Sequence, residues 1–252
     1  MSIVNTVSAV SAVSADSSQP NDELNPGLKS GLTHAAIGAD GWCREARRYD
    51  SPNCDARPEG VAVELLVIHA ISLPAGRFGG PHIADLFTNR VDFAVDPSFA
   101  DLRGVTVSAH FLVRRDGAVL QFVSCNERAW HAGVSCFGGR DQCNDFSVGI
   151  EVEGSDHVAF SPAQYQSLAV LNLALGSRYP LAVLAGHEHI APGRKTDPGS
   201  FFRWESLAES MLTFAEQSVS PPPAGGARLV VAHRLVAALC ALINVNGRTR
   251  KK

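Results

Sequence analysis

The sequence predicts an α/β fold formed by one compact domain, and three observations support this. Residues 63–69 and 181–187 are short, nearly continuous apolar runs, which are typical of strands buried on both faces. Residues 107–123 contain two strand-like runs separated by Asp116-Gly117. Apolar side chains recur at helical spacing in residues 161–179. Strands and helices therefore alternate along one segment of the chain.

The predicted elements follow one another in a simple order. The strand at 63–69 is followed by a hairpin of 107–115 and 118–123, for which Asp116-Gly117 favours a tight primed turn. Residues 147–153 alternate, so that Val148, Ile150 and Val152 share one face and Gly149, Glu151 and Glu153 the other. The remaining predicted elements are a helix opening at a Ser161–Gln164 capping box and ending near Tyr179, the strand at 181–187, and a last helix at 202–216.

Composition excludes several classes of protein. The chain has 252 residues, 45% of them hydrophobic, which is enough for a sizeable core. With 22 basic and 25 acidic residues its net charge is −3, so we expect no nucleic-acid partner. The longest late apolar run, residues 235–243, is far shorter than the roughly 20 residues that cross a bilayer. The first residues lack the features of a secretory signal, so we expect a cytoplasmic protein without a membrane span.

The ends of the chain differ from its centre. Residues 1–40 are rich in small polar residues and are expected to form a flexible leader, while 41–217 form the domain. Residues 218–227 contain SVSPPPAGG and are expected to be a linker. Residues 228–252 predict an amphipathic helix or a disordered tail. The helix could dock on the domain, pair with another subunit or touch a membrane, and docking or disorder is favoured over membrane contact. The six cysteines lack a C-x-x-C pair, and we expect free, mostly buried thiols in preference to disulfides.

Two histidines and a carboxylate form a candidate metal site. His69 and His187 each end a strand-like run, and the loop after His187 brings Lys195 and Asp197. Two imidazoles and one carboxylate suit a catalytic zinc ion that keeps one position for water. Glu151 could then take the proton of the water, and Lys195 could stabilise an oxyanion. The alternative is that each histidine only packs at a strand end, since no H-E-x-x-H motif is present.

The sequence around these residues resembles one family closely. The segments that carry the resemblance, in order along residues 41–217, are GWCREARRYDSPNCDARP, VIHAISLPAGRFGGPHIADLFTN, SAHFLVRRDGAVLQFV, RAWHAGVS, CNDFSVGIEVEGSD and GHEHIAPGRKTDPG. They are similar to those of the AmpD-type 1,6-anhydro-N-acetylmuramyl-L-alanine amidases, which are cytoplasmic enzymes of bacterial cell-wall recycling.

The resemblance implies a mixed central sheet flanked by helices, in a single catalytic domain with one catalytic zinc ion. His69, His187 and Asp197 match the zinc ligands, Glu151 the general acid/base and Lys195 the group that stabilises the transition state. The implied reaction hydrolyses the amide between the lactyl group of N-acetylmuramic acid and the L-alanine of the stem peptide. The implied substrate is a small soluble anhydro-muropeptide, and we expect a monomer.

Other residues are candidates for substrate contact or depart from the family pattern. Trp130 and His131 could pack against sugar or could simply shape their loop. Thr106 and Gln142 stand where the family has arginines that could grip a carboxylate, and Arg140 could substitute for one of them. The preference for a stem peptide is therefore open. We also note that Ala70 replaces an asparagine, and we expect His110 to be a satisfied buried histidine and His189 to be exposed.

Three rival functions remain at this stage. The same chemistry could act on intact murein, as in exported or phage-borne relatives. A non-catalytic peptidoglycan-recognition module typically loses a zinc ligand, whereas this chain keeps the full candidate set. A structural zinc protein would usually close the fourth position with Cys or His, for which Cys136 and Cys143 are poor candidates.

Overall fold

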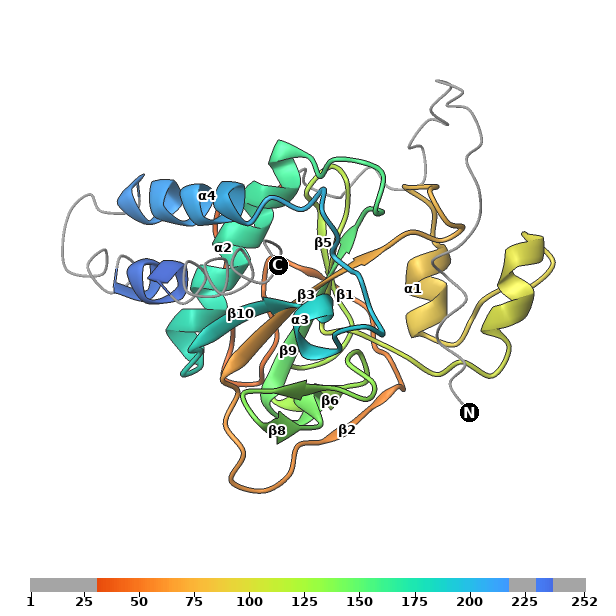
Figure 1. Ribbon diagram of the computed structural model, residues 1–252, viewed down its shortest axis with the longest axis horizontal. Helices are drawn as coiled ribbons and strands as arrows, with labels where there is room; N and C mark the ends of the chain where they lie inside the picture. The colour runs from red at the N-terminus through yellow and green to blue at the C-terminus, as the bar shows by residue number, and fades with distance from the viewer. Residues whose placement is uncertain (1–30, 218–229, 238–252) are drawn as a thin grey trace.

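The computed structural model of the protein describes residues 31–217 and 230–237 (Figure 1). At its centre lies a six-stranded mixed sheet with the strand order β1-β5-β4-β9-β3-β10. Four neighbouring strands are parallel, while β5 is antiparallel to β4 and parallel to β1. The strands of this sheet are β1 (Arg47–Arg48), β3 (Leu65–Ile71), β4 (Phe111–Val113), β5 (Val119–Gln121), β9 (Ser147–Glu153) and β10 (Val183–Gly186). The mixed sheet with flanking helices confirms the predicted fold class.

The remaining elements surround this sheet. Two small antiparallel sheets, β2 with β6 and β7 with β8, lie together at one end of it (Figure 1). Their strands are β2 (Cys54–Ala56), β6 (Glu127–Ala129), β7 (Cys136–Phe137) and β8 (Arg140–Asp141). The helices are α1 (His82–Phe87), α2 (Pro162–Arg178), α3 (His187–Ile190) and α4 (Trp204–Gln217), with 3₁₀ turns at Pro97–Leu102 and Cys143–Phe146. None of the helices in the described ranges is long and apolar enough to cross a membrane.

One face of the sheet is covered by α2, with α4 packed alongside it (Figure 1). The capping box predicted for α2 is present, because Ser161 Oγ accepts the Gln164 N–H at 3.2 Å and Gln164 Oε1 accepts the Ser161 N–H at 2.9 Å. Leu168, Leu171 and Leu175 are fully buried against the sheet in the cluster that contains Ile150. This face is therefore the main hydrophobic core.

The opposite face of the central strands has a smaller apolar cluster, which includes Val67, Ala132 and Ala185. Side chains alternate between the two faces of a strand, so His69 shares this face with Val67, and Glu151 shares it because it pairs with His69 in register. Loops rather than long helices cover this side. It is the side on which the candidate site lies.

The hairpin of β4 and β5 is present, but the predicted primed turn is wrong. A primed type I turn needs a positive φ at both central residues, whereas Gly117 has a φ of 86° and Asp116 is not left-handed. The Gly117 N–H donates to the Arg114 carbonyl at 2.9 Å, so the turn begins earlier and ends on the left-handed glycine. A Cβ at Gly117 would lie 2.8 Å from the Ala163 carbonyl oxygen, so close packing against α2 also requires glycine here.

The domain begins before residue 41, which corrects the expected boundary of the leader. Leu32 and Ala35 are buried, and the Leu32 N–H donates to Ser167 Oγ of α2 at 2.9 Å. Residues 1–30 lie outside the described part of the chain, as does the expected linker at 218–227.

Part of the expected C-terminal tail is described and is helical at residues 230–237. Val231, Ala232 and Leu235 are buried there, and Arg234 donates to the Gly176 carbonyl of α2 at 3.1 Å. This contact supports docking on the domain among the three alternatives. Residues 238–252 lie outside the described ranges.

The cysteines that the structure describes are all free, as predicted. They are Cys43, Cys54, Cys125, Cys136 and Cys143, of which only Cys136 is exposed. Cys240 lies outside the described residues.

Candidate metal centre

His69 and His187 are brought together by the pairing of β3 with β10. Gly186 pairs with Ile68, so the next residue of each segment lies at the same level of the sheet. The two Nδ1 atoms are 3.0 Å apart. Asp197 completes the group, with its Oδ2 3.1 Å from His187 Nδ1 and 3.3 Å from His69 Nδ1. Two distant strand ends and one loop thus converge on a single point.

The loop after α3 folds back to deliver Asp197. The Lys195 N–H donates to the Ala191 carbonyl at 3.0 Å, which turns the chain directly after the helix. The Glu188 N–H donates to the Asp197 carbonyl at 2.9 Å, which ties the backbone of Asp197 to the beginning of α3. The carboxylate is held beside His187 by its own main chain.

The donor atoms of this group fit a metal ion. His187 Nε2 lies 3.1 Å from the Ala132 carbonyl, which can only accept, so Nε2 carries the proton and a neutral His187 has a bare Nδ1. That lone pair points at a second imidazole nitrogen and a carboxylate oxygen, all within 4.8 Å of one another. A cation between these three atoms would be bound by all of them. Two imidazole nitrogens and one carboxylate oxygen with an open fourth position suit zinc.

The site also shifts the pKa values of its ionisable groups. Burial, together with the neighbouring His187, lowers the pKa of His69 to about 4, which keeps the imidazole neutral and able to ligate. Burial alone would raise the pKa of Asp197, but the adjacent imidazoles of His187 and His69 outweigh burial and hold it below its usual range. The lowered pKa values of His69 and Asp197 thus favour a neutral imidazole and a carboxylate, the forms that bind a metal ion.

Glu151 lies next to this group on the same face of the sheet. It pairs in register with His69 across the parallel β3–β9 ladder. Its Oε2 is buried and has no hydrogen-bond partner. Burial, reinforced by the charge of Asp197 and opposed by that of Lys195, raises the pKa of Glu151 well above its ordinary value. A carboxyl group in this setting binds a proton more readily than an exposed glutamate does, as a general acid or base requires.

The three residues predicted to contact substrate lie in different surroundings. Trp130 follows β6 and is half-buried, with its backbone N–H donating to Ser108 Oγ at 3.1 Å. Arg140 pairs with Glu64 and lies over the Phe146 ring, 4.0 Å from its centroid. Glu64 precedes β3, roughly 16 Å along the strand from the level of His69. The roles in substrate binding stay predictions.

His131 lies behind His69 and does not face solvent, where a sugar would bind. It is buried, and its Nδ1 and Nε2 contact His69 Nε2 and Ser147 Oγ. A role in shaping the site, the other alternative for this residue, agrees better with these contacts.

His110 and His189 can also be compared with expectation. His110 is buried and satisfied, as predicted: its Nδ1 accepts the Gly149 N–H at 3.0 Å and its Nε2 faces the Glu127 carbonyl at 3.1 Å. His189 is not exposed, because its Nδ1 accepts the Gly186 N–H at 2.8 Å and its side chain is only 12% exposed. The prediction for His189 is therefore wrong.

Sequence reasoning missed the residues behind the ligands, namely Ser147, Ala132 and Asn144. Asn144 Oδ1 accepts the N–H groups of both His131 and Ala132, at 3.2 and 2.8 Å. One signal was available in Gly149, because a glycine on the polar face of a strand often marks a close approach. A Cβ at Gly149 would clash with the His131 ring.

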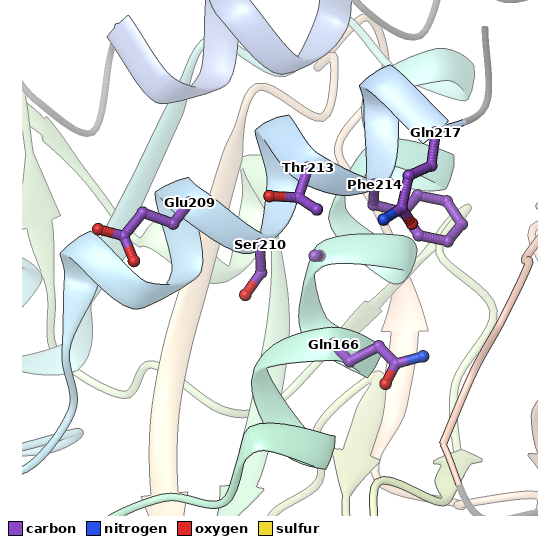
Figure 2. Close-up of a pocket in the computed structure, with 7 residues that line it drawn as sticks. Gln166, Glu209, Ser210, Thr213, Phe214 and Gln217 are labelled. Carbon is purple, nitrogen blue, oxygen red and sulfur yellow. The ribbon is translucent and has the colours of Figure 1, made fainter.

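A groove lies elsewhere, along α2 and α4 (Figure 2). Its lining residues are Gln166, Ala169, Glu209, Ser210, Thr213, Phe214 and Gln217. These helices cover the apolar face of the sheet, whereas His69 lies on the other face. The groove is therefore separate from the candidate metal centre.

Comparison with known proteins gives consistent matches over the same region. Residues 59–200 match the family model described as N-acetylmuramoyl-L-alanine amidase. The chain is 53% identical to the 1,6-anhydro-N-acetylmuramyl-L-alanine amidase AmpD of Citrobacter freundii over 167 residues, which is 66% of this chain and 89% of that protein. It is 52% identical to AmpD of Escherichia coli K12 over 166 residues, or 65% and 91% of the two chains.

Solved structures agree with these matches. A crystal structure of an Se-Met derivative of AmpD superposes with a TM-score of 0.67 at 52% sequence identity, covering 68% of this chain and 97% of the other. Residues 59–200, which match the family model, contain the strands and the loop that bring His69, His187 and Asp197 together.

Proposed function

The chain belongs to the N-acetylmuramoyl-L-alanine amidase family, and from this premise we propose that it is a zinc amidase of murein recycling. Its proposed reaction is hydrolysis of the amide between the lactyl group of 1,6-anhydro-N-acetylmuramic acid and the L-alanine of the stem peptide. The observation that carries the proposal is the convergence of His69 Nδ1, His187 Nδ1 and Asp197 Oδ2 beside the buried carboxyl of Glu151. The proposed substrate is a soluble anhydro-muropeptide, and the proposed setting is the cytoplasm, with the protein acting as a monomer.

His69, His187 and Asp197 would hold one zinc ion. Zinc supplies Lewis-acid chemistry, which polarises a carbonyl group and makes water a nucleophile at neutral pH. The two neutral imidazoles and the single carboxylate leave the site one net positive charge with the ion in place. A site with this charge favours the negative charge that develops on a carbonyl oxygen under attack.

Glu151 would move the proton. Water attacks the lactyl carbonyl carbon while a Glu151 oxygen takes one of its protons. The C–N bond then breaks, and Glu151 returns the proton to the departing alanine nitrogen, which gives a muramic carboxylic acid and a free peptide amine. The raised pKa of Glu151 suits both halves of this transfer. Lys195, whose positive charge acts on Glu151, would stabilise the oxyanion.

Few residues are proposed to recognise the sugar and the stem peptide of the substrate. Trp130 offers a half-buried aromatic surface for the sugar. Arg140 could contact a stem-peptide carboxylate only by leaving Glu64, its partner in the structure. Thr106 and Gln142 cannot replace the bidentate grip of an arginine on a carboxylate. We therefore expect weak selectivity for the carboxylates of the stem peptide.

The test is mass spectrometry of the purified protein incubated with anhydro-muropeptide, with intact sacculi in a parallel reaction. We expect free stem peptide and anhydro-muramic sugar from the soluble substrate, lost with a chelator and restored by zinc. The Glu151→Ala variant serves as the inactive control with its metal ligands intact. Release from sacculi instead would make the protein a wall-lytic amidase. Binding of muropeptide without release would make it a recognition module, and either result would contradict the proposal.

A further inference from the structure

A chain of buried polar groups lies directly behind His69. His69 Nε2 is 2.9 Å from His131 Nδ1, and His131 Nε2 is 3.2 Å from Ser147 Oγ. Ser147 Oγ is in turn 2.5 Å from the Cys143 carbonyl oxygen. His69, His131 and Ser147 are all buried. The chain ends on a group that can only accept a hydrogen bond.

That fixed end determines the direction of every proton along the chain. The Ser147 hydroxyl must donate to the Cys143 carbonyl, so Ser147 Oγ accepts the Nε2–H of His131. A buried imidazole that contacts only another imidazole and a hydroxyl is neutral, so His131 has a bare Nδ1. This nitrogen accepts the Nε2–H of His69. A neutral His69 is then left with its lone pair on Nδ1, facing His187 and Asp197.

The next residue along the chain does the same for the second histidine. The Ala132 carbonyl accepts the Nε2–H of His187 at 3.1 Å, and it also accepts from Arg194 at 2.9 Å. Asn144 Oδ1 holds the backbone of this segment through the N–H groups of His131 and Ala132. Two consecutive residues of one loop thus orient both imidazoles.

We propose that His131 is a positioning residue that sets the tautomer and orientation of His69, so that the Nδ1 lone pairs of His69 and His187 meet at the metal. The inference rests on the proposed zinc site and extends it to the groups behind the ligands. Such partners of metal-binding histidines typically contribute 10–100-fold to metal affinity (a range of about 1.4–2.7 kcal/mol). Gly149 contributes to the same arrangement, because only glycine leaves room for the His131 ring.

The test compares two variants of equal branching, His131→Asn and His131→Leu, in the full chain. The amide oxygen of asparagine lies near the place of the imidazole Nδ1 and can accept from His69, whereas leucine cannot. We expect His131→Leu to bind zinc about 10–100-fold more weakly than the wild type, in competition with a chromogenic chelator. We expect His131→Asn to recover most of that loss. Equal weakening in both variants, or wild-type affinity in His131→Leu, would overturn the inference.

His110→Asn is the matched control. His110 is also buried, and its ring centroid is 5.8 Å from that of His131, yet its hydrogen bonds go to Gly149, Glu127 and Arg57. We expect this variant to lose stability while keeping wild-type zinc affinity. A wild-type protein that binds no zinc would instead contradict the proposed function, so the two failures are distinguishable.

A second measurement uses the wild-type protein and does not depend on whether a variant folds. Long-range ¹H–¹⁵N spectra of the imidazole rings distinguish protonated from bare ring nitrogens. We expect His69 and His131 to carry their protons on Nε2 in the zinc-loaded protein, and both assignments to persist after the metal is removed. A proton on Nδ1 of His131, or its migration to Nδ1 of His69 in the metal-free protein, would show that the polar chain does not set the tautomer.

Discussion

The two faces of the central sheet use the same strands for opposite purposes. On β9, Val148 and Ile150 point to the face covered by α2 and α4 and belong to the main core. Their neighbours Ser147, Gly149 and Glu151 point to the other face. There they supply a hydrogen bond to His131, room for the His131 ring, and a carboxyl group with a buried, unpartnered oxygen, respectively. A period of two thus separates stability from chemistry within one strand.

This division predicts which substitutions alter stability and which alter the chemistry of the site. A substitution on the face of α2 should lower stability and leave the chemistry of the folded protein unchanged. A substitution among the groups proposed to hold the cation or move the proton should chiefly change the chemistry.

Asp197→Ala should have the largest effect, since it removes the only carboxylate of the proposed metal site. We expect zinc content to fall below stoichiometric and amide hydrolysis to fall to background. Metal analysis and the muropeptide assay measure both. Asp156→Asn is the control, because Asp156 lies beside the same loop and bonds Thr196 without touching the ligands. Full zinc content in Asp197→Ala would remove Asp197 from the site.

Glu151→Gln should keep the metal but lower kcat by at least roughly a hundredfold, because the amide cannot exchange a proton with water or the leaving nitrogen. At pH 7 the same variant should raise the free energy of unfolding of the metal-free protein. The raised pKa of Glu151 means that its ionised form is disfavoured by folding, and glutamine removes that cost. Chemical denaturation and steady-state kinetics test the two halves, and near-wild-type turnover would refute the assigned role.

Ile150→Ala, one position away on the other face, should show the opposite pattern. Ile150 is fully buried in the main core, so the cavity should lower the free energy of unfolding by about 2–5 kcal/mol. The kcat of the folded fraction and its zinc affinity should stay within about twofold of the wild type, because Ile150 faces away from the site. A twofold change corresponds to less than about 0.5 kcal/mol. A loss of kcat as large as that of Glu151→Gln would show that the two faces are not independent.

Acid should lower the free energy of unfolding through the buried histidine His110. Burial, aided by the charge of Arg57, lowers the pKa of His110 to about 3, below its ordinary value of 6.5. As the pH falls from 6.5 to 3, the unfolded chain takes up a proton that folded His110 does not, so the free energy of unfolding decreases. The contribution is up to about 1.4 kcal/mol per pH unit. Denaturation at several pH values should show a shallower slope for His110→Asn than for the wild type, and an unchanged slope would contradict this.

Sequence periodicity and the residues at strand ends predicted the parts of this fold that depend on residues close together in the sequence. The alternation at 147–153 predicted both faces of β9, and the histidines at the ends of 63–69 and 181–187 predicted which strands flank the site. The packing of Leu32 beside α2 and the left-handed turn at Gly117 were not predictable, because both depend on contacts with α2. The contact of His131 with His69 was not predictable either, because the two residues lie 62 positions apart in the chain.

We propose that the site face of the sheet binds one catalytic zinc ion between two Nδ1 atoms and one carboxylate. The most direct test is anomalous diffraction at the zinc absorption edge from crystals grown with the metal. We expect one strong peak within about 2.0–2.2 Å of His69 Nδ1, His187 Nδ1 and an Asp197 oxygen. A peak at other residues, coordination through Nε2 of either histidine, or no peak at this site would contradict the account.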